Sequence, residues 1–313
     1  MADVPTTAAR GGGRAISPGL VTALTVWGTR LAWLLVAVLG GRAVGDALAD
    51  HDAGAARALT VAAWLGWAAG ALPLLVASVT SLTTGRVVVP GALAVAVACL
   101  LGGAAAGGLV ALAVPAVVAT VLVMAAEVGR AWVQASAYGD EQRFPLRPPL
   151  GYLVASIATW SVWAAAVLTA VVALISGRPG LGLVAAVVAG AGALLLPRRW
   201  HQLSRRWLVL VPAGLVVHDP VVLGETLMVP RAHVAGLRLV RVRPAQELAA
   251  ADLTGPTAAV GVEVTLTEAA TALFAPRPGR PKGRAIHVLA FVVAPSRPGA
   301  VLTEARRRRL PVL

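Results

Sequence analysis

Two patterns of apolar residues divide the chain. From about residue 20 to residue 197, apolar residues run almost without interruption, in stretches of about twenty or more. A helix needs about 20 such residues to cross the hydrocarbon core of a bilayer. After Trp207 the apolar runs become short and rich in Val and Leu, and Pro, Gly and Asp separate them, which is typical of β-strands. The pattern therefore predicts a membrane-embedded helical part followed by a β domain.

The apolar runs of the helical part predict six membrane spans. The apolar run from Val87 to Ala126 is too long for one span and breaks at the glycines of residues 102–108, so we expect two helices there. An alternative for the first run is a signal peptide cleaved after Ala49, but Arg42 and Asp46 interrupt the run before that site. The expected spans lie within residues 20–48, 58–82, 87–126 (two spans), 150–176 and 181–196.

Arginine placement predicts the orientation of these spans. Arginines are frequent in the N-terminal segment, in residues 127–149 and in residues 198–206, and they are sparse in the segments between. Cytoplasmic loops of membrane proteins carry an excess of Arg and Lys. We therefore expect a multi-pass protein of the cell membrane with both termini in the cytoplasm.

Arg30 leaves two alternatives open. If the first span begins near Val21, Arg30 lies inside the bilayer, where a charge is costly and marks a functional site. If the span begins at Leu31, Arg30 anchors its cytoplasmic end. The second arrangement costs less and is the one we expect.

The pattern of the second half predicts one soluble domain, residues 207–313. We expect it to consist mostly of antiparallel strands, with a closing helix. A disordered segment (1–20), the transmembrane domain (21–197) and a basic linker (198–206) precede it, and residues 275–285 form a basic loop within it. The closing helix is expected within residues 296–310, with its arginines at the C-terminal end, where cations suit the helix dipole. The expected strands are residues 207–211, 214–219, 226–229, 236–242, 260–266 and 285–293.

Two resemblances support this architecture. The order WLVLVPAGLVVHDPVVLGETLMVPRAHVAGLRLV (residues 207–240) resembles the opening of bacterial pleckstrin-homology-like (PH-like) domains attached to membrane helices. The whole layout, with AYGDEQRFPLRPP (137–149) and FVVAPSRPGAVLTEARRRR (291–309), resembles a group of uncharacterised actinobacterial multi-span membrane proteins. These resemblances imply a bacterial membrane protein with a PH-like domain and imply no activity.

Composition agrees with a bilayer as solvent. Hydrophobic residues make up 58% of the 313 residues and charged residues 13%, about half the share in soluble domains. The net charge is +13, and from Arg198 onward the chain has 17 basic and seven acidic residues. Such an excess can hold a domain against anionic lipid headgroups. No groove-reading helix or aromatic stacking module is apparent, so we expect no nucleic-acid partner.

The chain offers little catalytic chemistry. Cys99 is the single cysteine, and the five histidines lack metal-binding spacing. His218 and Asp219 fit a strand end followed by a turn-starting aspartate. Asp140 and Glu141 lie in a polar, proline-rich loop, where we expect solvated carboxylates that pair locally with Arg143. The sequence therefore predicts a protein that is not an enzyme and that holds no cofactor or metal.

We expect a membrane scaffold whose cytoplasmic domain contacts a protein partner, a second copy of the chain or the anionic lipid surface. The alternative is a transporter of small molecules or lipids, which needs a polar cavity at the midplane of the bundle. The residues expected to contact the membrane surface or a partner are Arg143, Phe144, Arg147, Arg198, Arg199, Arg205 and Arg206.

Overall fold

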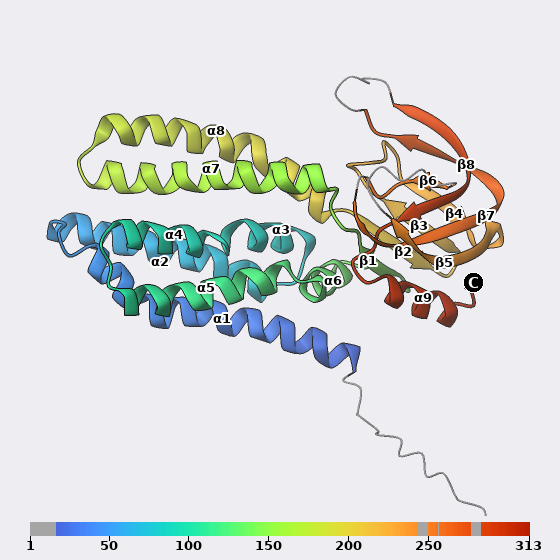
Figure 1. Ribbon diagram of the computed structural model, residues 1–313, viewed down its shortest axis with the longest axis horizontal. Coiled ribbons are helices and arrows are strands. Elements are labelled where there is room, and N and C mark those ends of the chain that lie inside the picture. Colours follow the sequence, from blue (N-terminus) through green and yellow to red (C-terminus); the bar gives the residue numbers. More distant parts are fainter. Residues whose placement is uncertain (1–16, 243–249, 256, 277–282) are drawn as a thin grey trace, which may run out of the picture.

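The computed structural model describes residues 17–242, 250–255, 257–276 and 283–313. Six of the described helices are long and apolar enough to cross a membrane. A helical bundle forms one end of the molecule and a β domain forms the other (Figure 1). The expected multi-pass architecture is thus confirmed. Most of the expected disordered segment and the centre of the expected basic loop, residues 1–16 and 277–282, lie outside the described residues.

The bundle consists of six spans and one short helix. Helices α3 and α4 form a single span, which Pro90 interrupts because proline has no backbone N–H to continue the helix. The short helix α6 follows the fourth span. The bounds are α1 (Pro18–Ala47), α2 (Ala53–Leu75), α3 (Val79–Val88), α4 (Gly91–Leu101), α5 (Ala106–Met124), α6 (Ala126–Ala135), α7 (Leu150–Ile175) and α8 (Pro179–Ser204).

Three helix boundaries differ from those expected. The second span ends at Leu75, and Ser78 caps the start of α3 by accepting a hydrogen bond from the Ser81 backbone N–H, so Arg86 lies in the third span rather than in a loop. Helix α8 continues through most of residues 198–206, which were expected to form a linker. Helix α1 begins at Pro18, inside the segment expected to be disordered. At each of these three places, the boundary of the helix differs from the boundary of the apolar run.

Small residues let the spans approach one another. A Cβ atom on Gly70 would lie 2.3 Å from the Trp33 ring, and one on Gly108 would lie 3.1 Å from the Ala43 backbone nitrogen. A Cβ atom on Gly66, one turn before Gly70, would meet nothing within 4 Å. Such close approach is the usual basis of helix packing in membranes.

Arginine and tryptophan side chains cap the helix ends that face the β domain. The Arg30 Nε donates to the Leu74 carbonyl at 2.9 Å, and the Trp132 Nε1 donates to the Pro73 carbonyl at 3.2 Å. The last carbonyls of a helix have no partner inside the helix and carry partial negative charge. Arg30 therefore lies level with the last turn of α2, although α1 itself begins twelve residues earlier.

The β domain contains two four-stranded sheets. One has the order β1-β2-β3-β4 and is antiparallel, and the other has the order β5-β7-β8-β6, in which only β6 runs parallel to its neighbour among the described strands. The six expected strands are present. The bounds are β1 (Gln142–Pro145), β2 (Trp207–Val211), β3 (Gly214–His218), β4 (Leu227–Pro230), β5 (Val234–Val242), β6 (Ala251–Asp252), β7 (Ala259–Phe274) and β8 (Arg284–Val293).

Strand β1 comes from the segment between two spans. It pairs antiparallel with β2, with Gln142 opposite Leu210 and Pro145 opposite Trp207. The loop between α6 and α7 was expected to lie at the membrane surface, and instead it contributes an edge strand to the β domain. The domain is therefore built from two separate parts of the chain (Figure 1).

A helix closes the β domain, as expected. Helix α9 (Pro298–Arg307) packs its apolar Val301, Leu302 and Ala305 against the core between the sheets. After it the chain adds a last contact, in which the Leu237 backbone N–H donates to the Pro311 carbonyl at 2.9 Å. The C-terminal residues are thus part of the fold.

Candidate functional site at the junction of the bundle and the β domain

A buried ion pair lies where the last span enters the β domain. Arg206, immediately before β2, donates from Nε to Asp219 Oδ1 at 2.8 Å and from Nη2 to Asp219 Oδ2 at 2.7 Å. Arg206 is 1% exposed and Asp219 is 2% exposed. A buried pair with two parallel hydrogen bonds has a fixed geometry, since each charge depends on the other for its partner.

The same pair connects four segments of the chain. Arg206 Nη1 donates to the Arg147 carbonyl at 2.5 Å, in the segment between β1 and α7, and Nη2 donates to the Thr254 carbonyl at 3.4 Å, after β6. Asp219 accepts the backbone N–H groups of Val221 and Val222 at 3.1 Å, as expected for a turn-starting aspartate. The polar groups of the pair are therefore satisfied, and the pair fixes the junction.

The structure places the expected arginines of residues 198–206 in two environments. Arg198, Arg199 and Arg205 are exposed around the last turn of α8. The expectation of a membrane or partner contact was wrong for Arg206, because its side chain is enclosed in the β domain. The sequence pattern of four arginines does not distinguish the buried one, since the signal lies in its distant partner Asp219.

The expected contact residues of the loop between α6 and α7 are also divided. Phe144 is 2% exposed and belongs to the core of the β domain, so the expectation that it dips into the membrane surface was wrong. Arg143 pairs with Glu141 at 2.6 Å, as expected, and its guanidinium stacks 5.2 Å from the centre of the Trp207 ring. Arg147 keeps an exposed side chain.

His218 lies beside these groups at the end of β3. Its ring stacks on Trp207 with centres 5.1 Å apart. Burial lowers the pKa of His218 below its ordinary value, and the positive charges of Arg205 and Arg143 lower it further, while Asp219 opposes them. The histidine is therefore held in its neutral form near neutral pH.

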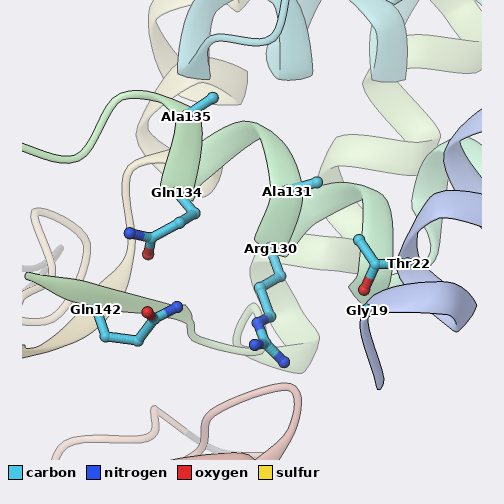
Figure 2. Close-up of a pocket in the computed structure, with 7 residues that line it drawn as sticks. All are labelled: Gly19, Thr22, Arg130, Ala131, Gln134, Ala135 and Gln142. Carbon is cyan, nitrogen blue, oxygen red and sulfur yellow. The ribbon is translucent and has the colours of Figure 1, made fainter. Parts of the chain in front are cut away.

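Two adjoining pockets lie at the junction. The larger, about 580 Å³, is lined by α1, α6, the segment after β1 and the start of α9, and it includes Arg130, Arg147 and Arg297. The smaller, about 350 Å³, lies between α1, α6 and β1. Both share Thr22 and Arg130. Figure 2 shows the Arg130 side chain extending from α6 away from the helix, toward a segment of the β domain, with Thr22 of α1 to one side.

Charged contacts cross from the bundle to the β domain near these pockets. Glu127 of α6 forms an ion pair with Arg297, the residue that precedes α9. On the same side of the domain, Arg308 at the end of α9 pairs with Asp140 at 2.8 Å. These contacts join the closing helix to α6 and to the segment before β1.

The described residues show no group of three or more His, Cys, Asp or Glu side chains that could hold a metal ion. Cys99 is buried in the bundle. Sequence reasoning missed Arg130 and Arg297 as pocket residues. Arg130 could be counted among the basic residues before β1, but its neighbour Arg297 lies more than 160 residues further along the chain. Backbone hydrogen bonds between the end of β1 and the segment before α9 bring the two together: the Ser296 N–H donates to the Pro145 carbonyl and the Arg147 N–H to the Ala294 carbonyl, each at 2.8 Å.

Comparison of the chain with protein-family models, with curated proteins and with solved structures gives no match.

Proposed function

We propose that the protein is a non-enzymatic scaffold of the bacterial cell membrane, which presents its β domain at a fixed position on the cytoplasmic side to a protein partner or to the lipid surface. The observation that carries this proposal is strand β1, because the bundle itself supplies an edge strand to the β domain. A domain on a flexible tether would need no such strand. The buried pair of Arg206 and Asp219 adds a second rigid connection.

The location of the pockets supports a scaffold over a transporter. A transporter binds its substrate near the midplane of the bilayer, in a cavity with polar groups. Two pockets lie at the junction, and the residues that line them come from the start of α1, from α6, from the segments around β1 and α9, and from β7. Transport stays the alternative outcome of the test below.

The layout of the β domain supports its assignment as PH-like. Three sequential antiparallel strands, β2 to β4, precede a second sheet that contains β5, β7 and β8, and helix α9 then closes the core. This is the order of elements that the sequence resemblance implies. PH-like domains offer their exposed surfaces for binding, which agrees with a role in contact rather than in catalysis.

The arginine distribution supports a cytoplasmic β domain. Among the described residues, more arginines lie at the end of the bundle that meets the β domain than at the far end. By the positive-inside rule, this distribution supports a cytoplasmic position for the β domain. Green fluorescent protein fused to the C-terminus should fluoresce, and an active alkaline phosphatase fusion at the same position would contradict this orientation. The arginines at the end near the β domain are Arg30, Arg86, Arg130, Arg198 and Arg199, and those at the far end are Arg42, Arg57 and Arg178.

The scaffold role can be tested by photo-crosslinking of the full chain in native membranes. A photoreactive residue at Leu239 or Leu289, which are 49% and 61% exposed on the β domain, should give discrete crosslinks to a protein or to lipid headgroups. The matched control carries the same photoreactive residue at Val187 of helix α8. Val187 is 72% exposed on the surface of the bundle and should crosslink only to acyl chains.

The contradicting result has two parts. If neither β-domain position gives a crosslink to a protein or to a lipid headgroup that the Val187 control lacks, the β domain makes no such contact. If the purified chain also carries solutes across liposome membranes, the transporter alternative replaces the scaffold.

A further inference from the structure

We propose that the larger junction pocket, lined by Arg130, Arg147 and Arg297, binds a phosphate group, of the kind carried by an anionic membrane lipid. Its volume of about 580 Å³ lies within the range of small-molecule sites and is ample for a lipid headgroup. The inference rests on the proposed membrane placement, but it concerns a site that a partner protein would not need.

The charge of the pocket favours an anion. Three arginines face one carboxylate, Glu127, which is already paired with Arg297. Within the described residues, the side chains of Arg130 and Arg147 make no ion pair or hydrogen bond. Their donors are therefore available, and guanidinium groups match the geometry of phosphate oxygens.

The start of helix α9 adds to this field. Pro298, Gly299 and Ala300 line the pocket, and they form the first turn of a ten-residue helix. The N-terminus of a helix carries partial positive charge. Of the three residues, Pro298 has no backbone N–H and the Ala300 N–H donates to the Arg297 carbonyl at 3.1 Å, which leaves the Gly299 N–H for a ligand. The arginine cluster and the helix terminus thus act on the same space.

The depth of the pocket fits the headgroup layer. Helix α1 has 30 residues and is about 45 Å long, whereas the hydrocarbon core is about 30 Å thick. Arg30 lies level with the end of α2, so the preceding turns of α1 extend beyond the hydrocarbon core. Val21 and Thr22, which line the pocket, are in these turns, and the exposed Leu24 and Trp27 continue toward the acyl chains.

Lipid binding by the purified full chain tests the proposal. Native mass spectrometry in detergent would measure binding of phosphatidylglycerol to the wild type and to the double variant Arg130→Gln with Arg147→Gln. At the usual contribution of a basic residue near anionic lipid, the double variant should bind about 30-fold more weakly. The matched control, Arg284→Gln with Arg306→Gln, removes the same charge from exposed positions of the β domain outside the pocket and should bind within about twofold of the wild type.

Competition with inorganic phosphate identifies the source of the phosphate group. Displacement of the lipid by millimolar phosphate would support a site that also accepts free phosphate, and retention of the lipid would support a lipid site. Equal lipid binding by the wild type and the pocket variant, or equal loss in the control, would overturn the proposal. If the double variant is unstable, Arg147→Gln alone changes an exposed side chain and serves the same test.

Crosslinking from Leu239 separates this inference from the proposed function. A lost lipid site with unchanged crosslinks would leave the scaffold proposal in place, and lost crosslinks with retained lipid binding would leave the pocket in place.

Discussion

The bundle and the β domain bury different residues. Half of the 14 buried residues in the largest cluster of the described bundle are alanine, whereas two of the 23 in the β-domain core are alanine and most of the others are Leu or Val. Large apolar side chains such as Leu183 and Leu194 instead point outward from the spans. In the β domain, large apolar side chains are buried in the core, away from water. In the bundle, large apolar side chains face lipid.

This difference shows that two driving forces act along one chain. Water drives the burial of Leu and Val in the β domain. Lipid tails are as apolar as leucine, so the spans pack through small residues and close approach. At the junction between the two regions, backbone pairing at β1 and the ion pair of Arg206 and Asp219 add to the burial of Phe144 in the core of the β domain.

The largest expected effect is at that ion pair. Arg206→Ala leaves Asp219 buried without its partner and should destabilise the β domain by about 3–5 kcal/mol. Thermal unfolding of the full chain in detergent would measure the loss of stability. Limited proteolysis would show whether the chain becomes easier to cleave on the C-terminal side of β2. Arg205→Ala, at an exposed neighbour, should stay within about 0.5 kcal/mol of the wild type. Equal effects of the two changes would show that the junction does not depend on the pair.

A smaller effect is expected in the bundle. Gly70→Ala places a Cβ atom against the Trp33 ring, whose Nε1 is held by the Trp67 carbonyl at 3.1 Å, and it should cost about 1–3 kcal/mol. Gly66→Ala meets open space on the same helix and should be neutral or stabilising, since alanine favours helices by up to about 1 kcal/mol. The midpoint of thermal unfolding in detergent compares the two variants. A harmless Gly70→Ala would contradict packing by close approach.

The smallest effect is a pH dependence that belongs to the β domain. The pKa of His218 lies below its ordinary value of 6.5, so the folded state binds fewer protons than the unfolded state. The stability from this group is therefore complete above about pH 6.5 and is lost as the pH falls through the folded-state pKa. The midpoint of thermal unfolding should therefore fall as the pH is lowered from about 7.5 to about 5.5.

His218→Gln should flatten this slope, whatever constant offset results from the lost stacking on Trp207. His287→Gln replaces an exposed histidine on β8, away from Trp207, and serves as the control for a histidine substitution in the β domain. An unchanged slope in His218→Gln would assign the pH dependence to other groups. The lowered pKa of Glu304, which results mainly from its hydrogen bond with Arg307, acts only below pH 4.5 and does not enter this window.

The sequence predicted the spans and the strands of residues 207–313 because each is marked by its own length or period. It could not predict β1, because QRFP is four residues long and its partner strand begins more than 60 residues later. The end of α8 was placed too early for a related reason. The apolar run stops at Leu196, but arginine is a good helix former, so the helix continues as far as Ser204.

The candidate site was only partly predictable. Exposed arginines at the end of α8 follow from the positive-inside pattern alone. The burial of Arg206 and Phe144 depends on partners that are distant in sequence, Asp219 and the core between the sheets. The pocket with Arg130 and Arg297 likewise exists only once β1 has joined the two parts of the chain.

The central claim is that a segment between two spans forms part of the β domain, and disulfide formation across β1 and β2 tests it most directly. In a Cys99→Ala background, Arg143→Cys and Val209→Cys are placed opposite each other and should form a disulfide when isolated native membranes are treated with a mild oxidant such as copper phenanthroline. Arg143→Cys with Val216→Cys, one strand further away, should not, because two strand spacings of about 4.8 Å exceed the reach of a disulfide. A disulfide at the first pair alone is the predicted result, and no disulfide there, or equal yields at both pairs, would contradict the account.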